Sequence, residues 1–362
     1  MENKTIRSLQ AIRGVAALLV VFYHYKTMAG LENSSGVLGA LLNAGGIGVT
    51  IFFILSGFIM IYSSEGKSSA LEFAISRFSR IYPAYLFFIL ISFAVSGAMS
   101  TFHYESKTIS FLTSFVFLPY EMINIPAYID FSGASGVRWT LNYEMFFYAL
   151  MALSMLFKNK NTALFLMFFM LLVIIPILSG FHPTLGIYGY QYENVMMAFI
   201  TNPIMYQFLL GVVVALTYKQ ADKAPASLKA LALIFSVFIV GYYCFYKGYN
   251  NHGLLSSGGY LLLFFYSVII NRHWLDKLTP GFLVYLGEIS FSVYLFHNPV
   301  RYLIEKYAFK NEVGLYIALI SIFCTLCFSV FTHKYLEVAV SRKLKKWLLT
   351  KLQPVKARDA SV

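Results

Sequence analysis

The sequence predicts an all-α integral membrane protein, a bundle of about ten transmembrane helices with both termini in the cytoplasm. Of its 362 residues, 59% are hydrophobic and only 12% are charged, whereas soluble domains carry about 25% charged residues. The apolar runs are long enough for membrane helices rather than barrel strands, and the basic residues concentrate in alternate loops. This composition excludes a soluble globular protein, a disordered chain and a coiled coil.

A membrane-spanning helix needs roughly 20 mostly apolar residues. The segments that meet this requirement are Leu9–Met28, Ala44–Ser63, Tyr82–Met99, Trp139–Phe157, Ala163–Ser179, Pro203–Tyr218, Leu228–Tyr246, Leu254–Asn271, Leu283–Leu303 and Val313–Tyr335. The segment Ile109–Tyr120 is apolar but short, so we expect it to be re-entrant or interfacial. Gly48 and Gly57 in the second span are interpreted as positions of close helix packing.

The distribution of lysine and arginine predicts the orientation, because these residues are enriched in cytoplasmic loops. With the N-terminus in the cytoplasm, 21 of the 28 basic residues fall on the cytoplasmic side, including those from Arg342 to Arg358. Topology and attraction to anionic lipid therefore account for the net charge of +12, and nucleic acid is not needed to explain it. We expect residues 1–340 to form the transmembrane domain and residues 341–362 to form a basic cytoplasmic tail.

Arg13 and His24 share the first predicted span. An ionisable residue inside a membrane helix is a functional candidate, since a charge at the helix centre costs about 2.5–3.5 kcal/mol. Eleven residues are about three turns, so both side chains lie on one helix face, about 16 Å apart. That face would carry an anion-binding group near the cytoplasm and a proton-transfer group near the outside. The alternatives are an arginine that snorkels to the interface and an interfacial histidine.

Glu144 lies near the predicted outer start of the fourth span, after Trp139, whose indole suits the membrane interface. A carboxylate at this depth needs a partner. The candidates are His24, Arg138 and Arg301. The alternative is an ion pair that only locks two helices together.

His297 lies towards the predicted outer end of the ninth span, where the following Asn298 and Pro299 indicate a helix end. It is either an interfacial histidine or part of the reaction centre. We expect His24, Glu144 and His297 all to lie in the outer part of the bundle.

Arg77 and Arg80 close the loop that precedes the third predicted span. Their spacing of three residues directs both side chains to one side of a helical turn. Arginine offers forked, permanently charged donors that match phosphate oxygens. The alternative is that they are two of the charges that set the membrane orientation.

These segments, in this order, resemble the membrane-bound acyltransferase-3 family, which acylates bacterial surface and exported glycans. The matching segments are Leu9 to Ala17 followed by His24, Gly48-Val49 through Phe52-Phe53 to Ser56-Gly57-Phe58, Arg77-x-x-Arg80, Trp139-x-Leu141-x-x-Glu144, and Leu286 to Leu295 ending at His297. They extend from Leu9 to about Glu337, almost the whole chain. The sequence looks closest to members that O-acetylate exopolysaccharide.

The resemblance implies ten core helices in a bacterial cytoplasmic membrane, with acyl-CoA, expected to be acetyl-CoA, as the cytoplasmic donor. The acceptor would be a glycan or lipid-linked saccharide at the outer side. His24 becomes the catalytic histidine, Glu144 a carboxylate near the reaction centre, and Arg13 the partner of His24 in handling the donor. Arg77 and Arg80 become contacts for the phosphates of acyl-CoA. The possible acceptor-side residues are Trp139, Asn142 and His297.

The sequence departs from the family pattern at two positions. Thr50 stands where the family often has an acid after Gly-Val, so we expect Glu144 to orient His24 in its place. Glu337 is followed by Val338, where the family often has proline. The sequence shows no appended extracellular domain, so we expect the membrane bundle itself to serve the acceptor.

Two mechanisms and two other functions stay open at this point. His24 is either a general base on the acceptor hydroxyl or the nucleophile of an acyl-histidine intermediate. A transporter or exporter would show midplane sites and paired broken helices in two halves, and a non-catalytic subunit of a polysaccharide export machine would tolerate loss of His24. We expect no tightly bound cofactor. We also expect no metal, because Cys324 and Cys327 lack a second Cys or His pair.

Overall fold

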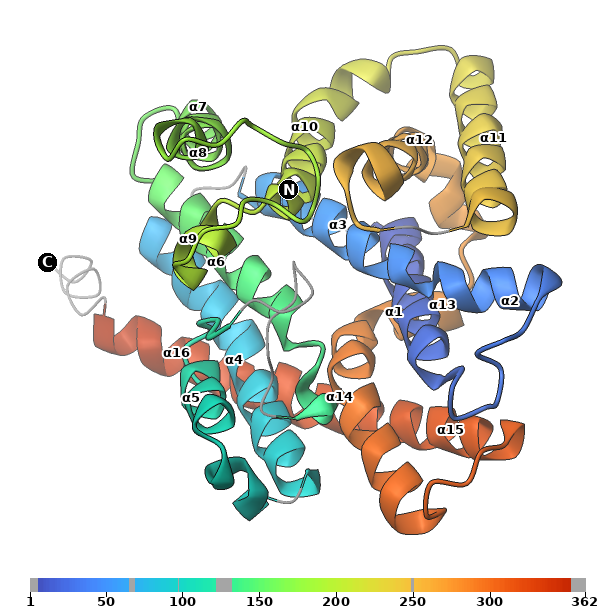
Figure 1. The fold of residues 1–362 in the computed structure, drawn as a ribbon. Helices are drawn as coiled ribbons and strands as arrows, with labels where there is room; N and C mark the ends of the chain where they lie inside the picture. Colours follow the sequence, from blue (N-terminus) through green and yellow to red (C-terminus); the bar gives the residue numbers. More distant parts are fainter. Residues whose placement is uncertain (1–5, 65–68, 97, 122–131, 249–250, 353–362) are drawn as a thin grey trace, which may run out of the picture.

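The computed structural model describes residues 6–64, 69–96, 98–121, 132–248 and 251–352 (Figure 1). All regular secondary structure in these residues is helical, as the sequence predicts. Lys4, Lys67 and residues 353–362 of the predicted basic tail lie outside the described residues.

The helices follow one another around a common core (Figure 1). The α-helices are α1 (Arg7–Tyr25), α2 (Gly36–Asn43), α3 (Ile47–Ser63), α4 (Ala70–Val95), α5 (Glu105–Ser114), α6 (Arg138–Ser154), α7 (Lys160–Phe169), α8 (Ile175–Leu178), α9 (Val195–Ile200), α10 (Tyr206–Ala221), α11 (Ala226–Tyr242), α12 (Gly259–Leu278), α13 (Gly281–Glu288), α14 (Ser290–Leu303), α15 (Leu315–Thr332) and α16 (Ser341–Leu352). Short 3-10 or π-helical segments used below are η1 (Ala44–Gly46), η2 (Ala98–His103), η6 (Tyr243–Lys247), η7 (Leu254–Gly258) and η9 (His333–Val340).

Eight helices in the described part of the chain are long and apolar enough to cross a membrane. They are Arg7–Tyr25, Gly36–Ser63, Ala70–Val95, Lys160–Leu178, Val195–Ala221, Ala226–Lys247, Leu254–Leu278 and Leu315–Leu352. Two predicted spans are not among them, because α6 has only 17 residues and Leu283–Leu303 is divided between α13 and α14. The chain is therefore a multi-pass helical protein, while the count of ten and the orientation stay predictions.

The predicted span Tyr82–Met99 starts too late. Helix α4 begins just after Ser69, whose hydroxyl accepts a hydrogen bond from the Glu72 amide at 3.1 Å, while the Glu72 carboxylate accepts one from the Ser69 amide at 3.2 Å. This reciprocal cap stabilises a helix start that hydropathy does not detect. Arg77 and Arg80, expected in a loop, therefore lie on a helix.

The predicted span Val313–Tyr335 continues much further than expected. Helix α15 passes through the π-helical segment η9 into α16. Lys345 Nζ of α16 donates a hydrogen bond to Ser76 Oγ of α4 at 3.1 Å. Residues 341–352 of the predicted tail therefore form a helix that packs along α4.

Glycine allows α3 and α10 to pack with their backbones in contact. A Cβ atom added at Gly57 would lie 2.0 Å from the Phe208 carbonyl oxygen, and one at Gly211 would lie 1.8 Å from the Ile54 carbonyl oxygen. A Cβ atom added at Gly48 would lie 2.5 Å from the Ala16 carbonyl oxygen of α1. The packing role predicted for Gly48 and Gly57 is confirmed.

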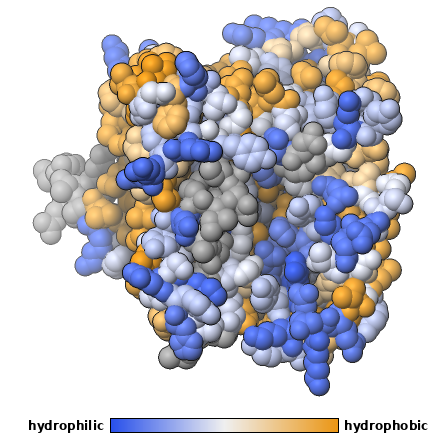
Figure 2. Space-filling view, in the orientation of Figure 1, coloured by the Kyte–Doolittle hydropathy of each residue, from blue (hydrophilic) through white to orange (hydrophobic). Residues whose placement is uncertain are grey.

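Helix α11 exposes a broad apolar surface. Its large apolar side chains point outward, with Ile234 67% and Phe238 70% exposed, whereas the polar Ser236 is buried. Figure 2 shows hydrophobic residues gathered along the upper and side margins of the molecule. Exposed apolar surface on this scale indicates contact with a membrane.

Polar contacts gather at the end of the bundle where α1 begins. The amide and hydroxyl groups of Ser8 donate to Asp276 Oδ1 at 2.7 and 2.6 Å. Asp222, just after α10, pairs with Arg272 of α12 at 2.8 Å and with Lys229 of α11 at 3.4 Å. These contacts fix α1, α10, α11 and α12 to one another at a shared end.

Candidate active site

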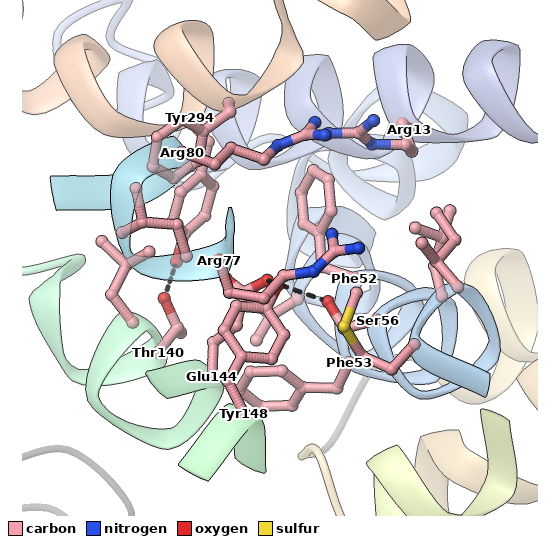
Figure 3. Close-up of a pocket in the computed structure, with 17 residues that line it drawn as sticks. Arg13, Phe52, Phe53, Ser56, Arg77, Arg80, Thr140, Glu144, Tyr148 and Tyr294 are labelled. Atoms are coloured by element: carbon pink, nitrogen blue, oxygen red, sulfur yellow. Dashed lines mark hydrogen bonds between the residues drawn. The ribbon is translucent and has the colours of Figure 1, made fainter. Parts of the chain in front are cut away.

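An open pocket with a cavity volume of about 100 Å³ lies between α1, α3, α4, α6 and α14 (Figure 3). Its charged lining residues are Arg13 from α1, Arg77 and Arg80 from α4, and Glu144 from α6. The other lining residues are Val49, Phe52, Phe53, Leu55, Ser56, Ile59, Met60, Ile81, Thr140, Leu141, Tyr148, Phe291 and Tyr294. The structure thus brings together four residues that the sequence singled out separately. We call this space the arginine pocket.

Three arginines and one carboxylate give the arginine pocket an excess of positive charge. Arg77 Nη2 donates a hydrogen bond to Ser63 Oγ at 3.1 Å, but its Nε is buried and has no partner among the described residues. Figure 3 shows the guanidinium groups of Arg13 and Arg80 directed towards each other across the pocket. Three guanidinium groups face one carboxylate, and arginine matches the oxygens of phosphates and carboxylates, so the pocket is suited to an anionic ligand.

Close packing of α1 against α13 sets the position of Arg13. A Cβ atom at Gly287 would lie 2.0 Å from the Gln10 carbonyl oxygen, and one at Gly14 would lie 2.9 Å from the Gly287 amide nitrogen. Gln10 also accepts a hydrogen bond from Arg13 Nη1 at 3.2 Å through its side-chain oxygen. The glycine contacts thus fix the part of α1 that carries Gln10 and Arg13. The hydrogen bond from Arg13 to Gln10 then holds the Arg13 guanidinium over the pocket.

Glu144 is held by hydroxyl groups. Ser56 Oγ of α3 donates a hydrogen bond to Glu144 Oε1 at 3.0 Å, and the Tyr148 hydroxyl donates to the same oxygen. Tyr148 follows Glu144 by one turn of α6, which places both side chains on one face. The carboxylate is therefore fixed at the wall of the arginine pocket.

The partners expected for Glu144 contact other groups. Arg138 is fully buried and donates to the Ser110 carbonyl and hydroxyl oxygens at 3.1 and 3.0 Å. Arg301 donates to the backbone carbonyl of His24 at 2.6 Å. Glu144 lies six residues into α6, about 9 Å from Arg138 along the helix axis. That depth places the carboxylate among the arginines instead of beside the histidines, contrary to our expectation.

Tyr294 connects the arginine pocket with the histidines. Its hydroxyl shares a hydrogen bond of 2.7 Å with Thr140 Oγ1 at the pocket wall. Its ring centroid lies 6.1 Å from that of His297, and its backbone carbonyl accepts a hydrogen bond from His297 Nδ1 at 2.7 Å. One turn of α14 thus lines the pocket and positions an imidazole.

His24 of α1 and His297 of α14 form a pair, with ring centroids 5.1 Å apart. Because the Tyr294 carbonyl can only accept a hydrogen bond, the proton of a neutral His297 is on Nδ1 and its Nε2 is an acceptor. That Nε2 is buried and has no partner among the described residues. The pair is therefore equipped to accept a proton from a hydroxyl group placed between the rings.

The other two predicted acceptor-side residues, Trp139 and Asn142, are on α6. The indole of Trp139 packs edge-on against Phe53, with centroids 6.2 Å apart, and lies 5.7 Å from the His252 ring. Asn142 is buried, and neither atom of its side-chain amide has a partner among the described residues.

Several side chains at these sites were not predicted. Tyr148 could have been found from its spacing of four residues from Glu144, whereas His252 lies in a segment without a local signal. Thr50, which occupies the position of the family's usual acid, contacts His252 Nδ1 at 3.2 Å. The other unpredicted residues are Ser56, Thr140 and Tyr294.

In the part of the chain that the structure describes, an arginine-lined pocket, a histidine pair and eight membrane-length helices characterise a multi-pass helical membrane protein. Residues 6–334 match the acyltransferase-3 family, described as an acyltransferase domain, and the chain belongs to this family. The resemblance seen in the sequence is confirmed.

The relatives are O-acetyltransferases at low identity. The O-acetyltransferase OatA of Staphylococcus aureus (strain NCTC 8325 / PS 47) is 22% identical over 377 residues, which cover 92% of this chain and 57% of OatA. OatA of strain COL gives the same values. This chain therefore spans little more than half the length of these relatives. No solved structure matches it.

Proposed function

We propose that this protein transfers an acyl group, in the first instance acetyl, from cytoplasmic acyl-CoA to a hydroxyl group of a surface or exported glycan. Its place would be the cytoplasmic membrane of a bacterium, in the orientation that the basic residues predict. Membership of the acyltransferase family supports the reaction class. The donor, the acceptor and the membrane are our proposals.

The arginine pocket is the observation that carries this proposal. Coenzyme A is polyanionic at its nucleotide end and has a long, thin pantetheine arm. Three arginines, one with an unsatisfied Nε, suit its phosphates. Arg13 and His24 lie on the same helix about 16 Å apart, a distance that such an arm can cover.

The histidine pair supplies the proton transfers in this mechanism. His24 removes the proton from the acceptor hydroxyl, and the oxygen attacks the thioester carbonyl carbon. His297 Nε2, which is an acceptor without a partner among the described residues, accepts a hydrogen bond from a neighbouring hydroxyl of the acceptor and so aligns the sugar. The carbon–sulfur bond then breaks, and protonated His24 returns its proton to the departing sulfur, which yields the glycan ester and coenzyme A. With an acyl-histidine intermediate, the acyl group would move in two steps, first from the sulfur to the histidine and then from the histidine to the hydroxyl oxygen.

Glu144 has a different part from the one expected. Its hydrogen bonds to Ser56 and Tyr148 hold it at the donor pocket, so we assign it to the donor site instead of to orienting His24. There it offsets part of the charge of the arginines, which allows coenzyme A to leave after transfer.

Transfer of label from [¹⁴C]acetyl-CoA to chemically de-O-acetylated surface polysaccharide in proteoliposomes tests the function. Wild-type protein should label the polysaccharide, and His24→Ala should not. His103→Ala, an exposed histidine in η2, is the matched control and should behave like wild type. Equal labelling by His24→Ala at equal protein content would refute the assignment. Movement of unmodified polysaccharide without labelling would indicate an exporter instead.

A further inference from the structure

A second pocket lies at the opposite end of the bundle from the start of α1. Its cavity volume is about 580 Å³. Its walls are the loop after α8 and described residues between Tyr243 and Tyr260. Helix α12 runs from this pocket to the contact between Asp276 and Ser8, and its 20 residues span about 30 Å. The second pocket is thus about one membrane thickness from the N-terminal end, and it faces outside in the predicted orientation.

The chemistry of the second pocket is the reverse of that of the arginine pocket. Among the described residues that line it, none is charged. Tyr243 and Tyr260 stack with ring centroids 4.4 Å apart and an angle of 11° between the planes. Asn251, Ser256 and Thr184 supply amide and hydroxyl groups. A sugar ring offers an apolar C–H face to an aromatic ring and hydroxyl groups to neutral polar side chains, so this lining suits a neutral saccharide.

The wall of the second pocket is fixed before any ligand binds. Asn251 Oδ1 accepts a hydrogen bond from the Gly253 amide at 2.8 Å, and the Asn251 carbonyl accepts one from Ser256 Oγ at 3.1 Å. The carbonyl of His252 accepts one from Gln207 Nε2 of α10 at 2.5 Å. A site held in this way loses little conformational entropy on binding.

The same wall reaches towards the arginine pocket. His252 lies between two lining residues, and its ring contacts Thr50 of α3 and the indole of Trp139. Trp139 packs against Phe53, which itself lines the arginine pocket. Neighbouring side chains therefore connect the two pockets through the core of the bundle.

We propose that the second pocket is the acceptor subsite and binds a neutral saccharide unit of the glycan while the unit to be acylated extends into the bundle. The assignment rests on the proposed function for the reaction, but binding to the pocket can be measured without it. The anionic donor and the neutral acceptor then occupy chemically opposite pockets at the two ends of the protein.

Two pocket variants test the proposal in full-length protein in nanodiscs. Tyr243→Ala removes one face of the tyrosine stack. Leu255→Trp fills the pocket from a side chain that is 83% exposed, so it disturbs little packing if the first variant folds poorly. Tyr246→Ala is the control, an exposed tyrosine in the same segment η6 that does not line the pocket. The probe is the de-O-acetylated polysaccharide, with binding followed by interferometry and acetyl transfer followed by label.

Both pocket variants should weaken polysaccharide binding about tenfold and raise its apparent KM by a similar factor, with the KM for acetyl-CoA unchanged. Tyr246→Ala and the inactive His24→Ala should bind like wild type. Equal binding by all variants, or none by wild type, would overturn the pocket assignment. Loss of binding confined to the pocket variants, with no acetyl transfer by wild type, would support the subsite and refute the proposed function.

Discussion

His24 at the end of α1 and His297 in α14 hold their imidazole rings with centroids 5.1 Å apart. The two residues are far apart in the sequence, and each is fixed through its backbone surroundings. His297 donates to the Tyr294 carbonyl, while the His24 carbonyl accepts from Arg301. Among the described residues, the rings of His24 and His297 contact each other and the tyrosine rings of Tyr23, Tyr25 and Tyr294.

Removing the two histidines separately and together shows whether they act as a unit. We expect His24→Ala and His297→Ala each to lower kcat by about 10²–10⁴-fold, the usual contribution of a positioned proton-transfer group. The kcat of the double variant should be only slightly lower than that of His24→Ala, because the effects of residues that act as a unit are not additive. Initial rates of acetyl transfer measure this. Losses that multiply in the double variant would show that the two rings act independently.

The arginine pocket predicts a defect in donor affinity. Arg77→Ala and Arg80→Ala should each raise the apparent KM for acetyl-CoA about ten- to a hundredfold, because a hydrogen bond to a charged group contributes about 1.5–3 kcal/mol. The KM of Arg77→Lys should lie between those of wild type and Arg77→Ala, because lysine keeps the positive charge but lacks the forked donors of the guanidinium group. Steady-state kinetics at saturating acceptor give the values, with the exposed Lys346→Ala of α16 as a control. If both alanine variants had the KM of wild type, the proposal that these arginines bind the phosphates of acetyl-CoA would be wrong.

Replacing Glu144 should change the KM for acetyl-CoA in the opposite direction. Glu144→Gln keeps the shape of the side chain but removes the negative charge that opposes the arginines. The KM for acetyl-CoA should therefore fall, by about two- to tenfold, as the Coulomb attraction for phosphate strengthens. Equilibrium binding of coenzyme A to detergent-solubilised protein checks the same effect. Weaker binding would mean that the carboxylate contacts the donor directly.

The contact between α3 and α10 predicts that a larger residue at Gly211 destabilises the protein. Gly211→Ala would place a methyl group 1.8 Å from the Ile54 carbonyl oxygen, so the helices must separate. We expect the free energy of unfolding to fall by about 1–3 kcal/mol or more, which is the usual cost of overpacking. Gly281→Ala is the control, because nothing lies within 4 Å of its added Cβ. Thermal unfolding in detergent compares the two, and an equal Tm would contradict the observed packing.

Local features were predictable from the sequence, and tertiary ones were not. The length of an apolar run is a local property, so most of the helices were found. The start of α4 was missed because a polar cap formed by Ser69 and Glu72 precedes its apolar part. The common face of Arg13 and His24 follows from helical periodicity alone.

The grouping of the site residues required the fold. Glu144 was expected with His24 because both belong to the predicted outer part of the bundle, but their positions depend on how α6 and α1 lie against α3. The contact between Thr50 and His252 joins two segments about 200 residues apart, and no periodicity in either segment indicates it. Sequence reasoning therefore gave the inventory of reactive groups but not their partners.

Arg301 has a consequence for how the protein can move. It donates to the His24 carbonyl at 2.6 Å and pairs with Glu305 at 3.3 Å, so it satisfies one of the carbonyl groups that the end of α1 leaves without an intrahelical partner. The same helix, α14, carries His297. A shift of α14 relative to α1 would break the contact between Arg301 and the His24 carbonyl, so Arg301 opposes a change in the spacing of the two imidazoles.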